Sequence, residues 1–115
     1  MRDIIFRGIG IKSREWVYGA YVPAMDEDDC DSIIDEQGEH HIVFSDTVGQ
    51  YTGLKDRAGE MIWEGDILSD GAFTYEVRYE GTGFVTILDG HVYTMDTRPT
   101  KIVIGNIHDN PDLLK

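Results

Sequence analysis

Apolar side chains in this chain recur at every second residue, and this period most constrains what it can fold into. Phe73, Tyr75, Val77 and Tyr79 alternate with polar residues, a pattern that gives a strand one apolar and one solvated face. No segment carries the sustained 3.6-residue apolar stripe that is typical of an amphipathic helix. The chain is therefore predicted to consist mainly of half-buried antiparallel strands.

Turn signals divide the alternating segments into short strands. Asp89-Gly90 is a two-residue hairpin signal, and Glu80–Gly83 is a short connection that contains glycine. Near the end, Asn110 is placed to cap a short helical turn whose first residue is Pro111. The segments expected to pair, or to form single strands, are 3–11 with 15–22, 32–35 with 40–44, 73–80 with 84–88 and 91–93, and 102–107.

Roughly eight short strands with close turns favour a small antiparallel barrel or a sandwich, and periodicity alone does not choose between them. A chain of 115 residues can bury one modest hydrophobic core without disulfides or metal. It has no repeat, linker or break in composition. The prediction is a single mainly-β domain over residues 1–115, with hairpin extensions and a short C-terminal helical turn.

The chain is strongly acidic, with 10 Lys and Arg against 22 Asp and Glu and a net charge of −12. Such a surface repels phosphate groups, so neither direct nucleic-acid binding nor binding to anionic membranes is expected. The charge either keeps the protein soluble or attracts a partner with a basic surface, and mimicry of DNA is one form of the second alternative.

The compartment is predicted from cysteine usage and from the first residues. Cys30 is the single cysteine and cannot form an internal disulfide, which favours a reducing compartment. The N-terminus has charges within its apolar stretch and no small-residue cleavage site, and no apolar run approaches the roughly 18 residues of a membrane helix. We expect a cytoplasmic protein.

The segment Val48–Leu68 is predicted to be a β-hairpin at the centre of the chain. Asp56 can accept hydrogen bonds from the backbone ahead of it, and Gly59 can take the positive φ that such a connection needs. Gly65 and Asp66 are expected to bend the chain before Ile67 and Leu68 enter the core. Turning the chain is a sufficient explanation for these glycines and acids.

This segment resembles the signature of the YopX family, small proteins carried mainly by phages and prophages of Gram-positive bacteria. Three other segments agree with the resemblance: Glu15–Gly19, Ile33–Asp35 and Ile104–Pro111. The match covers nearly the whole chain, and its motifs follow the order of the family. Residues 69–100 resemble nothing particular.

The resemblance implies a compact, β-rich protein with a barrel-like core that associates with itself and acts in the cytoplasm of a bacterial host. It carries over no catalytic activity and therefore no catalytic residue. No cofactor is expected. The resemblance thus indicates fold and origin but leaves the biochemical activity to be argued from the residues.

The densest acidic cluster is a candidate for contact with a protein partner. An EF-hand loop starting at its first residue would need Gly at the sixth position and Glu at the twelfth, where the chain has Asp31 and Gln37. A solvated acidic loop between two strands is the simplest interpretation. The residues chosen as candidates for partner binding are Asp26, Glu27, Asp28, Asp29 and Asp31.

Other chemistry finds little support in the sequence. Cys30, His40 and His41 are zinc-ligand types, but neighbouring residues on a strand point to opposite faces, so the two histidines could hardly bind one ion. His91 and His108 stand near Asp89 and Asp109, yet such neighbours are common by chance, and no nucleophile elbow, phosphate loop or dinucleotide fingerprint is present. No metal or catalytic residue is therefore assigned.

The aromatic residues suggest two further uses. A stacking platform for single-stranded nucleic acid normally lies in a basic groove, and here Arg57 and Arg78 are isolated. Core packing or a subunit interface fits better, and large aromatics that cannot all be buried favour self-association. They are Trp16, Tyr18, Tyr51, Trp63, Phe73, Tyr75 and Tyr79.

These observations favour a phage-encoded, non-enzymatic binding or regulatory protein that contacts a host or phage protein. A DNA mimic would instead spread its carboxylates along one face. A small hydrolase or nucleotide-processing enzyme would gather His91 or His108 with two acids in a concave pocket. A purely structural oligomer is a third alternative.

Overall fold

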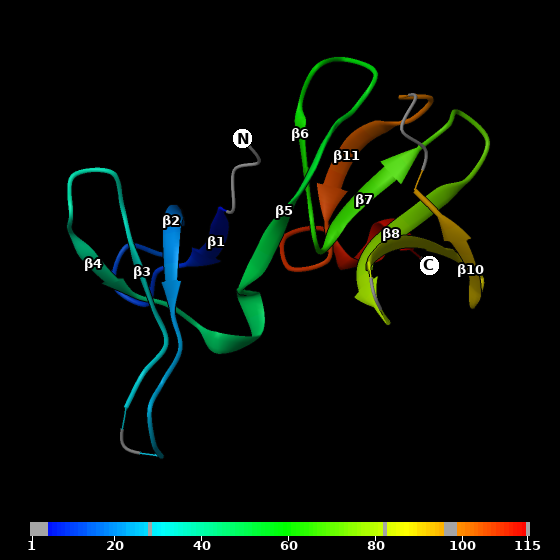
Figure 1. The fold of residues 1–115 in the computed structure, drawn as a ribbon. Coiled ribbons are helices and arrows are strands. Elements are labelled where there is room, and N and C mark those ends of the chain that lie inside the picture. The colour runs from blue at the N-terminus through cyan, green and yellow to red at the C-terminus, as the bar shows by residue number, and fades with distance from the viewer. Residues whose placement is uncertain (1–4, 28, 82, 96–98, 115) are drawn as a thin grey trace. The chain divides into compact units, whose positions relative to one another are not determined.

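The structure is a computed structural model that describes residues 5–27, 29–81, 83–95 and 99–114. Within these ranges the chain is all-β, with eleven strands and two short 3-10 helices, η1 (Ser45–Thr47) and η2 (Pro111–Leu114). None of the helices in the described residues is long and apolar enough to cross a membrane. The strands are β1 (Phe6–Ile9), β2 (Trp16–Val22), β3 (Ser32–Ile34), β4 (His40–Ile42), β5 (Gly49–Lys55), β6 (Met61–Trp63), β7 (Asp66–Ser69), β8 (Thr74–Glu80), β9 (Gly83–Leu88), β10 (His91–Thr94) and β11 (Ile102–Asn106) (Figure 1).

The strands form two antiparallel sheets. The first has six strands in the order β4-β3-β2-β1-β5-β6, and the second has five in the order β10-β9-β8-β7-β11. The chain divides into two compact units, residues 1–51 (unit 1) and residues 52–115 (unit 2), and each is described by itself. The predicted mainly-β antiparallel fold is confirmed, and the single domain over residues 1–115 stays a prediction.

The sheet of unit 1 returns on itself. β1 pairs with β2, β2 with β3, and β3 with β4. At the end of β4 the chain returns to the end of β1, where Ile11 N donates to Ile42 O at 2.9 Å and Phe44 N donates to Ile9 O at 3.0 Å. The hydrogen bonds therefore form a closed ring of four strands. Ile33 and Val43 are buried inside it, which gives unit 1 a barrel-like core.

Unit 2 contains the three consecutive strands that the alternating pattern predicted. β8 pairs with β9, and β9 with β10, which lies at one end of the strand order. The core consists of Ile62, Leu68 and Val77, with partly buried side chains packed against them: Leu54, Tyr75, Met95 and Val103. At the C-terminal end Leu113 N donates to Asn110 O at 3.1 Å, which starts the predicted helical turn.

The central hairpin is confirmed over β5 and β6. Asp56 N donates to Glu60 O at 2.7 Å, and Gly59, with φ of +89°, donates to Asp56 O at 3.0 Å. After Trp63 the chain bends at Gly65, whose φ is +92°. The next strand, β7, joins the second sheet rather than continuing the hairpin. This bend divides residues 60–68 into two strands and is one reason why there are eleven strands rather than roughly eight.

Candidate functional site

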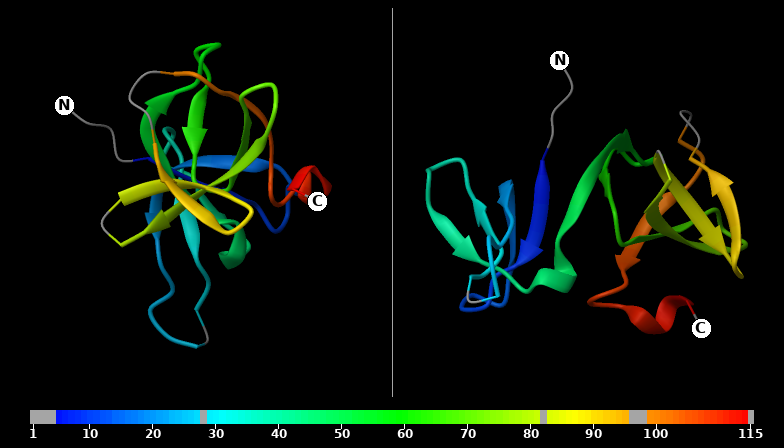
Figure 2. Two further views of the ribbon diagram at one scale, coloured as in Figure 1. Left: turned by 90° about the vertical axis from the view of Figure 1, so that its right-hand side faces the viewer. Right: turned by 60° about the horizontal axis from the view of Figure 1, so that its bottom comes forward.

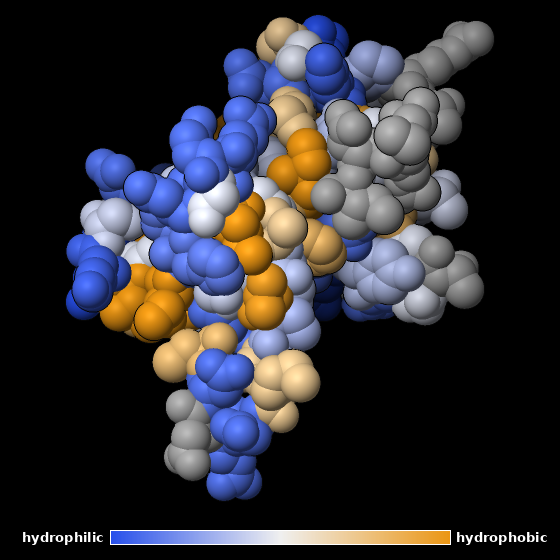
Figure 3. Space-filling view, turned by 60° about the vertical axis from the view of Figure 1, so that its left-hand side comes forward, coloured by the Kyte–Doolittle hydropathy of each residue, from blue (hydrophilic) through white to orange (hydrophobic). Residues whose placement is uncertain are grey.

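The acidic cluster lies in the connection between β2 and β3. The pairing of these strands ends at Val22 and Ser32, and residues 23–27 and 29–31 continue the hairpin away from the rest of unit 1 (Figures 1 and 2). Asp28 lies outside the described residues. Figure 3 shows the end of this hairpin, at the bottom, covered largely by hydrophilic residues. We call residues 23–27 and 29–31 the acidic tip.

Two of the candidate acids bind the backbone of the acidic tip. Asp29 accepts hydrogen bonds from Met25 N at 3.1 Å and from Cys30 N at 2.8 Å, and Asp31 accepts one from Ala24 N at 2.7 Å. These backbone donors hold the pKa of both carboxyl groups below the usual range, with a further hydrogen bond from Ser45 acting on Asp31. Asp29 and Asp31 therefore stabilise the conformation of the loop.

The remaining described residues of the tip face solvent. The side chain of Met25 is 86 % exposed, and Asp26 and Glu27 are exposed beside it. A methionine this exposed is unusual, because its thioether side chain is apolar and is commonly buried. The tip thus presents one apolar side chain beside carboxylates.

The structure does not bring Cys30, His40 and His41 together as ligands. Cys30 and His40 are exposed. His41 is half-buried, and its Nε2 lies 2.8 Å from Asp35 Oδ2. Among the described residues, the group around His41 that could hold a metal contains Asp35 and Glu39.

His91 begins a strand, and His108 lies in a turn. His91 is exposed at the start of β10. The backbone N–H groups of His108 and Asp109 both donate to Asn106 Oδ1, at 3.0 and 2.9 Å, and Asn106 Nδ2 donates to Asp109 Oδ2 at 3.0 Å. Asp109 thus helps to hold the turn before η2. Neither histidine lines the hollow beside the core of unit 2.

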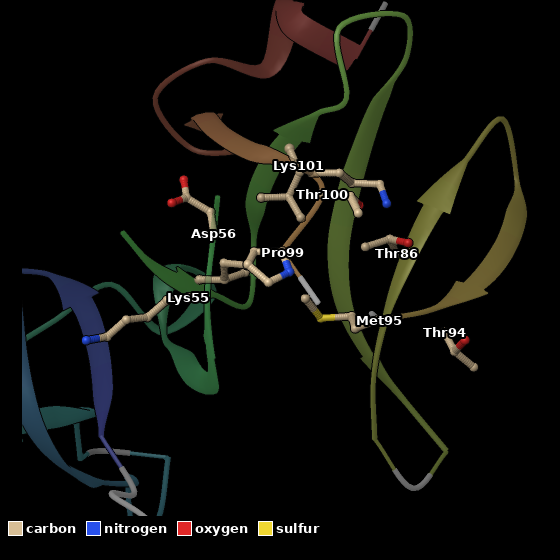
Figure 4. A pocket seen from close by; sticks show the side chains of 10 residues that line it. Lys55, Asp56, Thr86, Thr94, Met95, Pro99, Thr100 and Lys101 are labelled. Carbon is tan, nitrogen blue, oxygen red and sulfur yellow. The ribbon is translucent and has the colours of Figure 1, made fainter. Parts of the chain in front are cut away.

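That hollow is small (Figure 4). Its lining includes Thr86, Met95 and Lys101, and its free volume is about 20 Å³, enough for about one water molecule. Figure 4 shows the ammonium group of Lys55 pointing away from Thr86 and Met95. This hollow is too small to hold a metabolite.

Asp56 also lines this hollow, and its carboxylate is hydrogen-bonded to the backbone. It is 3 % exposed and accepts hydrogen bonds from Ala58 N, Glu60 N and Val103 N, each at 2.8 Å. Burial raises the pKa of Asp56, but these backbone donors outweigh burial and hold the pKa below its usual range. A carboxylate with its oxygens occupied in this way is explained as a structural group.

The aromatic residues of unit 2 form pairs rather than a platform in a basic groove. The rings of Tyr79 and Phe84 lie 5.0 Å apart, and those of Tyr75 and Tyr93 lie 6.3 Å apart. Arg78 is held by Glu76, with Nε to Oε2 at 2.7 Å. The positive charge of Arg78 is therefore neutralised, which disfavours phosphate binding.

The comparisons with known proteins agree with the fold and the motifs. The model of the YopX protein family matches residues 5–115. The chain belongs to the YopX family. Among solved structures it is similar to the crystal structure of protein EF1440 from Enterococcus faecalis, with a TM-score of 0.68 and 28 % sequence identity over 100 % of both chains. No match was found among curated proteins.

In this YopX protein, sequence reasoning located the acidic tip but missed two features of the surface. It did not single out Met25, because exposure cannot be read from a methionine within a loop. It did not join Asp35 and Glu39 to His41, which requires the register of the β3–β4 hairpin. The alternation of side chains along a strand, which placed His40 and His41 on opposite faces, is the only part of this arrangement that the sequence could show.

Proposed function

We propose that this YopX protein is a phage-encoded, non-enzymatic binding or regulatory protein that contacts a host or phage protein in the bacterial cytoplasm. The observation that carries the proposal is the side chain of Met25, 86 % exposed at the end of a projecting hairpin and flanked by acids. The acidic tip is the contact surface, and its partner has an apolar socket with a basic rim.

Met25 and its acidic neighbours are suited to different roles in an interface, which supports this assignment. Interfaces gain most of their affinity from a few apolar or aromatic side chains that enter a pocket and lose their water. Charges at the rim contribute more to the rate of encounter and to the choice of partner. Met25 is suited to the first role, since its flexible thioether adapts to irregular pockets. Asp26 and Glu27 are suited to the second.

The internal hydrogen bonds of the acidic tip also favour binding. A loop that becomes ordered only in the complex loses conformational entropy, and this loss weakens affinity. The bonds from Asp29 and Asp31 to Met25 N, Cys30 N and Ala24 N limit this loss, because they hold the loop in one conformation before it binds. The net charge of −12 extends the attraction to a basic partner beyond direct contact.

The test is affinity capture from the lysate of a Gram-positive host, with captured proteins quantified by mass spectrometry. The test variant carries Met25→Ser, Asp26→Asn and Glu27→Gln and retains Asp29 and Asp31, so that the loop keeps its hydrogen bonds. The matched control carries Glu15→Gln and Asp46→Asn, which neutralise the same number of exposed acids of unit 1 outside the tip.

We expect at least one protein to be captured by the wild type and by the control, and roughly tenfold less by the test variant, the effect of losing a typical hot-spot side chain. Equal recovery by all three proteins would exclude the acidic tip as the contact surface. An equal loss of captured protein in the control would mean that net charge alone drives the interaction and that Met25 has no specific role.

A further inference from the structure

The β3–β4 hairpin places three metal-ligating side chains on one side of the sheet. Ile33 pairs with His41, and Ile34 pairs with His40. One residue further, Asp35 N donates to Glu39 O at 3.0 Å, so Asp35 lies opposite Glu39. Because side chains alternate between the two sides of a strand, Asp35, Glu39 and His41 share one side, and His40 lies on the other.

The ligand atoms of this cluster are close enough to share one ion. Nε2 of His41 lies 2.8 Å from Asp35 Oδ2 and 4.0 Å from Glu39 Oε2. One ligand atom from each residue fits within 4.8 Å of the others. Two ligands of a tetrahedral zinc ion, each about 2.0–2.1 Å from the metal, are about 3.3 Å apart. Side-chain adjustments of roughly 0.5 to 1.5 Å, the larger ones at the exposed Glu39, would therefore admit the ion.

We propose that Asp35, Glu39 and His41 form a binding site for a divalent transition-metal ion of the zinc class. The donor set selects the class: an imidazole nitrogen suits Zn²⁺, Co²⁺, Ni²⁺ and Cu²⁺, whereas Mg²⁺ and Ca²⁺ prefer sites made of oxygen alone. Three protein ligands leave a coordination position for water. This site lies on a different hairpin from the acidic tip and does not depend on the proposed function.

Backbone groups near Asp35 already orient its carboxylate for metal binding. Its Oδ1 accepts hydrogen bonds from Gln37 N at 2.9 Å and from Glu39 N at 3.0 Å, which leaves Oδ2 directed to His41. Such outer bonds orient first-shell ligands in known metal sites.

The surroundings leave room for coordinated water. Asp35 and His41 line an open hollow of about 380 Å³ together with Val17, Tyr18, Glu36 and Gln37. The side chain of Glu39 is 75 % exposed, so it can move towards the ion with little rearrangement, while those of Asp35 and His41 are only 21 % and 28 % exposed. The site thus combines two anchored ligands with one adjustable ligand.

The experiment is isothermal titration of the tag-free protein with ZnCl₂, CoCl₂, MgCl₂ and CaCl₂ in separate runs. We expect one Zn²⁺ per chain, detectable Co²⁺ binding with the visible absorption of a low-symmetry site, and much weaker binding of Mg²⁺ and Ca²⁺. Zn²⁺ should also raise the melting temperature, because an ion that binds only the folded state stabilises it.

Neighbouring histidines supply the matched control. His41→Ala is expected to reduce Zn²⁺ affinity by more than about 100-fold, beyond the usual effect of a second-shell change, and His40→Ala to leave it unchanged. Asp35→Asn keeps an oxygen for Gln37 N and Glu39 N but loses the carboxylate charge, and it should weaken binding without unfolding the hairpin. Circular dichroism of each variant checks the fold.

Three results would overturn the proposal. The first is the absence of Zn²⁺ binding by the folded wild type. The second is equal weakening by His40→Ala and His41→Ala, which would indicate a different or nonspecific site. The third is tight Ca²⁺ binding that survives His41→Ala, which would assign the cation to carboxylates alone.

Discussion

Gly19 of β2 lies against the backbone of β3. Its φ is +156°, and a Cβ atom added to it would lie only 1.9 Å from the carbonyl oxygen of Ile34. Backbone atoms of a paired strand cannot turn aside as a flexible side chain can. We expect Gly19→Ala to lower the free energy of unfolding by about 3 kcal/mol, because the two strands must separate. Urea denaturation followed by tryptophan fluorescence measures this change.

Gly38, in the turn between β3 and β4, is the control for this substitution. It also has a positive φ, +82°, but no atom lies within 4 Å of the position of an added Cβ. Gly38→Ala should lower stability by only about 1 kcal/mol, the conformational effect of a left-handed residue with a side chain. Equal losses at both positions would contradict a steric role for Gly19.

Asp70, between β7 and β8, is surrounded by donors. It accepts hydrogen bonds from Phe73 N, Ala72 N and the hydroxyl of Tyr75, at 2.8, 2.9 and 2.8 Å. These bonds, led by that from Phe73, lower the pKa of Asp70 from 3.8 to about 2. The folded state therefore binds this proton more weakly than the unfolded state does. The resulting stabilisation is fully present above about pH 4 and is lost as the pH falls towards 2.

Asp70→Asn removes this linkage. We expect the variant to be less stable than the wild type at neutral pH, with a difference that shrinks between about pH 4 and pH 2. Asp46→Asn, at an exposed acid of η1, serves as the control and should follow the wild type more closely. Urea denaturation at a series of pH values checks the prediction, and a difference that stays constant through this range would contradict it.

At the scale of elements, Asp56 ties the β5–β6 loop to β11. Its Oδ1 accepts from Ala58 N and Glu60 N within the loop, and its Oδ2 accepts from Val103 N. Asp56→Ala leaves three donors without this acceptor and should lower the free energy of unfolding by about 3 kcal/mol. Asp56→Asn can keep the two loop bonds and should lose less, about 1 kcal/mol.

Hydrogen exchange separates the two parts of this connection. In Asp56→Asn the amide of Val103 should exchange faster than in the wild type, while those of Ala58 and Glu60 remain protected. If both variants lost the same stability and the same protection, the bond across to β11 would have no distinct contribution.

The elements differ in how far the sequence predicted them. The strands β8, β9 and β10 were predictable because alternation and Asp89-Gly90 are local signals. The closure of unit 1 was not, since it depends on contacts of Ile9 and Ile11 with Phe44 and Ile42, at and just after the end of β4. The short η1 was missed as well, because a single 3-10 turn leaves no periodic pattern.

The candidate sites show the same limit. The position of the acidic tip follows from composition, but which acids stabilise the loop depends on the bonds from Met25 N and Ala24 N to Asp29 and Asp31. Likewise, alternation separated His40 from His41, whereas the pairing of Asp35 with Glu39 needed the turn geometry. Local pattern therefore identifies the surface, and long-range or turn geometry determines its chemistry.

At the scale of the whole molecule, the net charge of −12 opposes association between copies, while the aromatic and apolar side chains left on the surface favour it. The edge strand β10 is exposed along its length, with Val92 56 % and Tyr93 48 % exposed. An edge strand without lysine or proline is open to pairing with another chain. We therefore infer that any self-association uses β10 and is limited by repulsion.

Salt weakens the charge repulsion between copies, whereas a lysine substitution in β10 weakens strand pairing, so the two effects can be measured separately. Raising the ionic strength from about 0.01 to 0.15 M shortens the screening length from about 30 to 8 Å, so association measured by sedimentation velocity should increase. Val92→Lys reduces the net negative charge, which by itself would favour association, yet it should weaken association because a charge on an edge strand blocks pairing. Ile104→Lys makes the same charge change on β11, where Val103 N already donates to Asp56 Oδ2, and should not weaken it. Monomers at both ionic strengths, or equal weakening by both lysines, would contradict a role for the β10 edge.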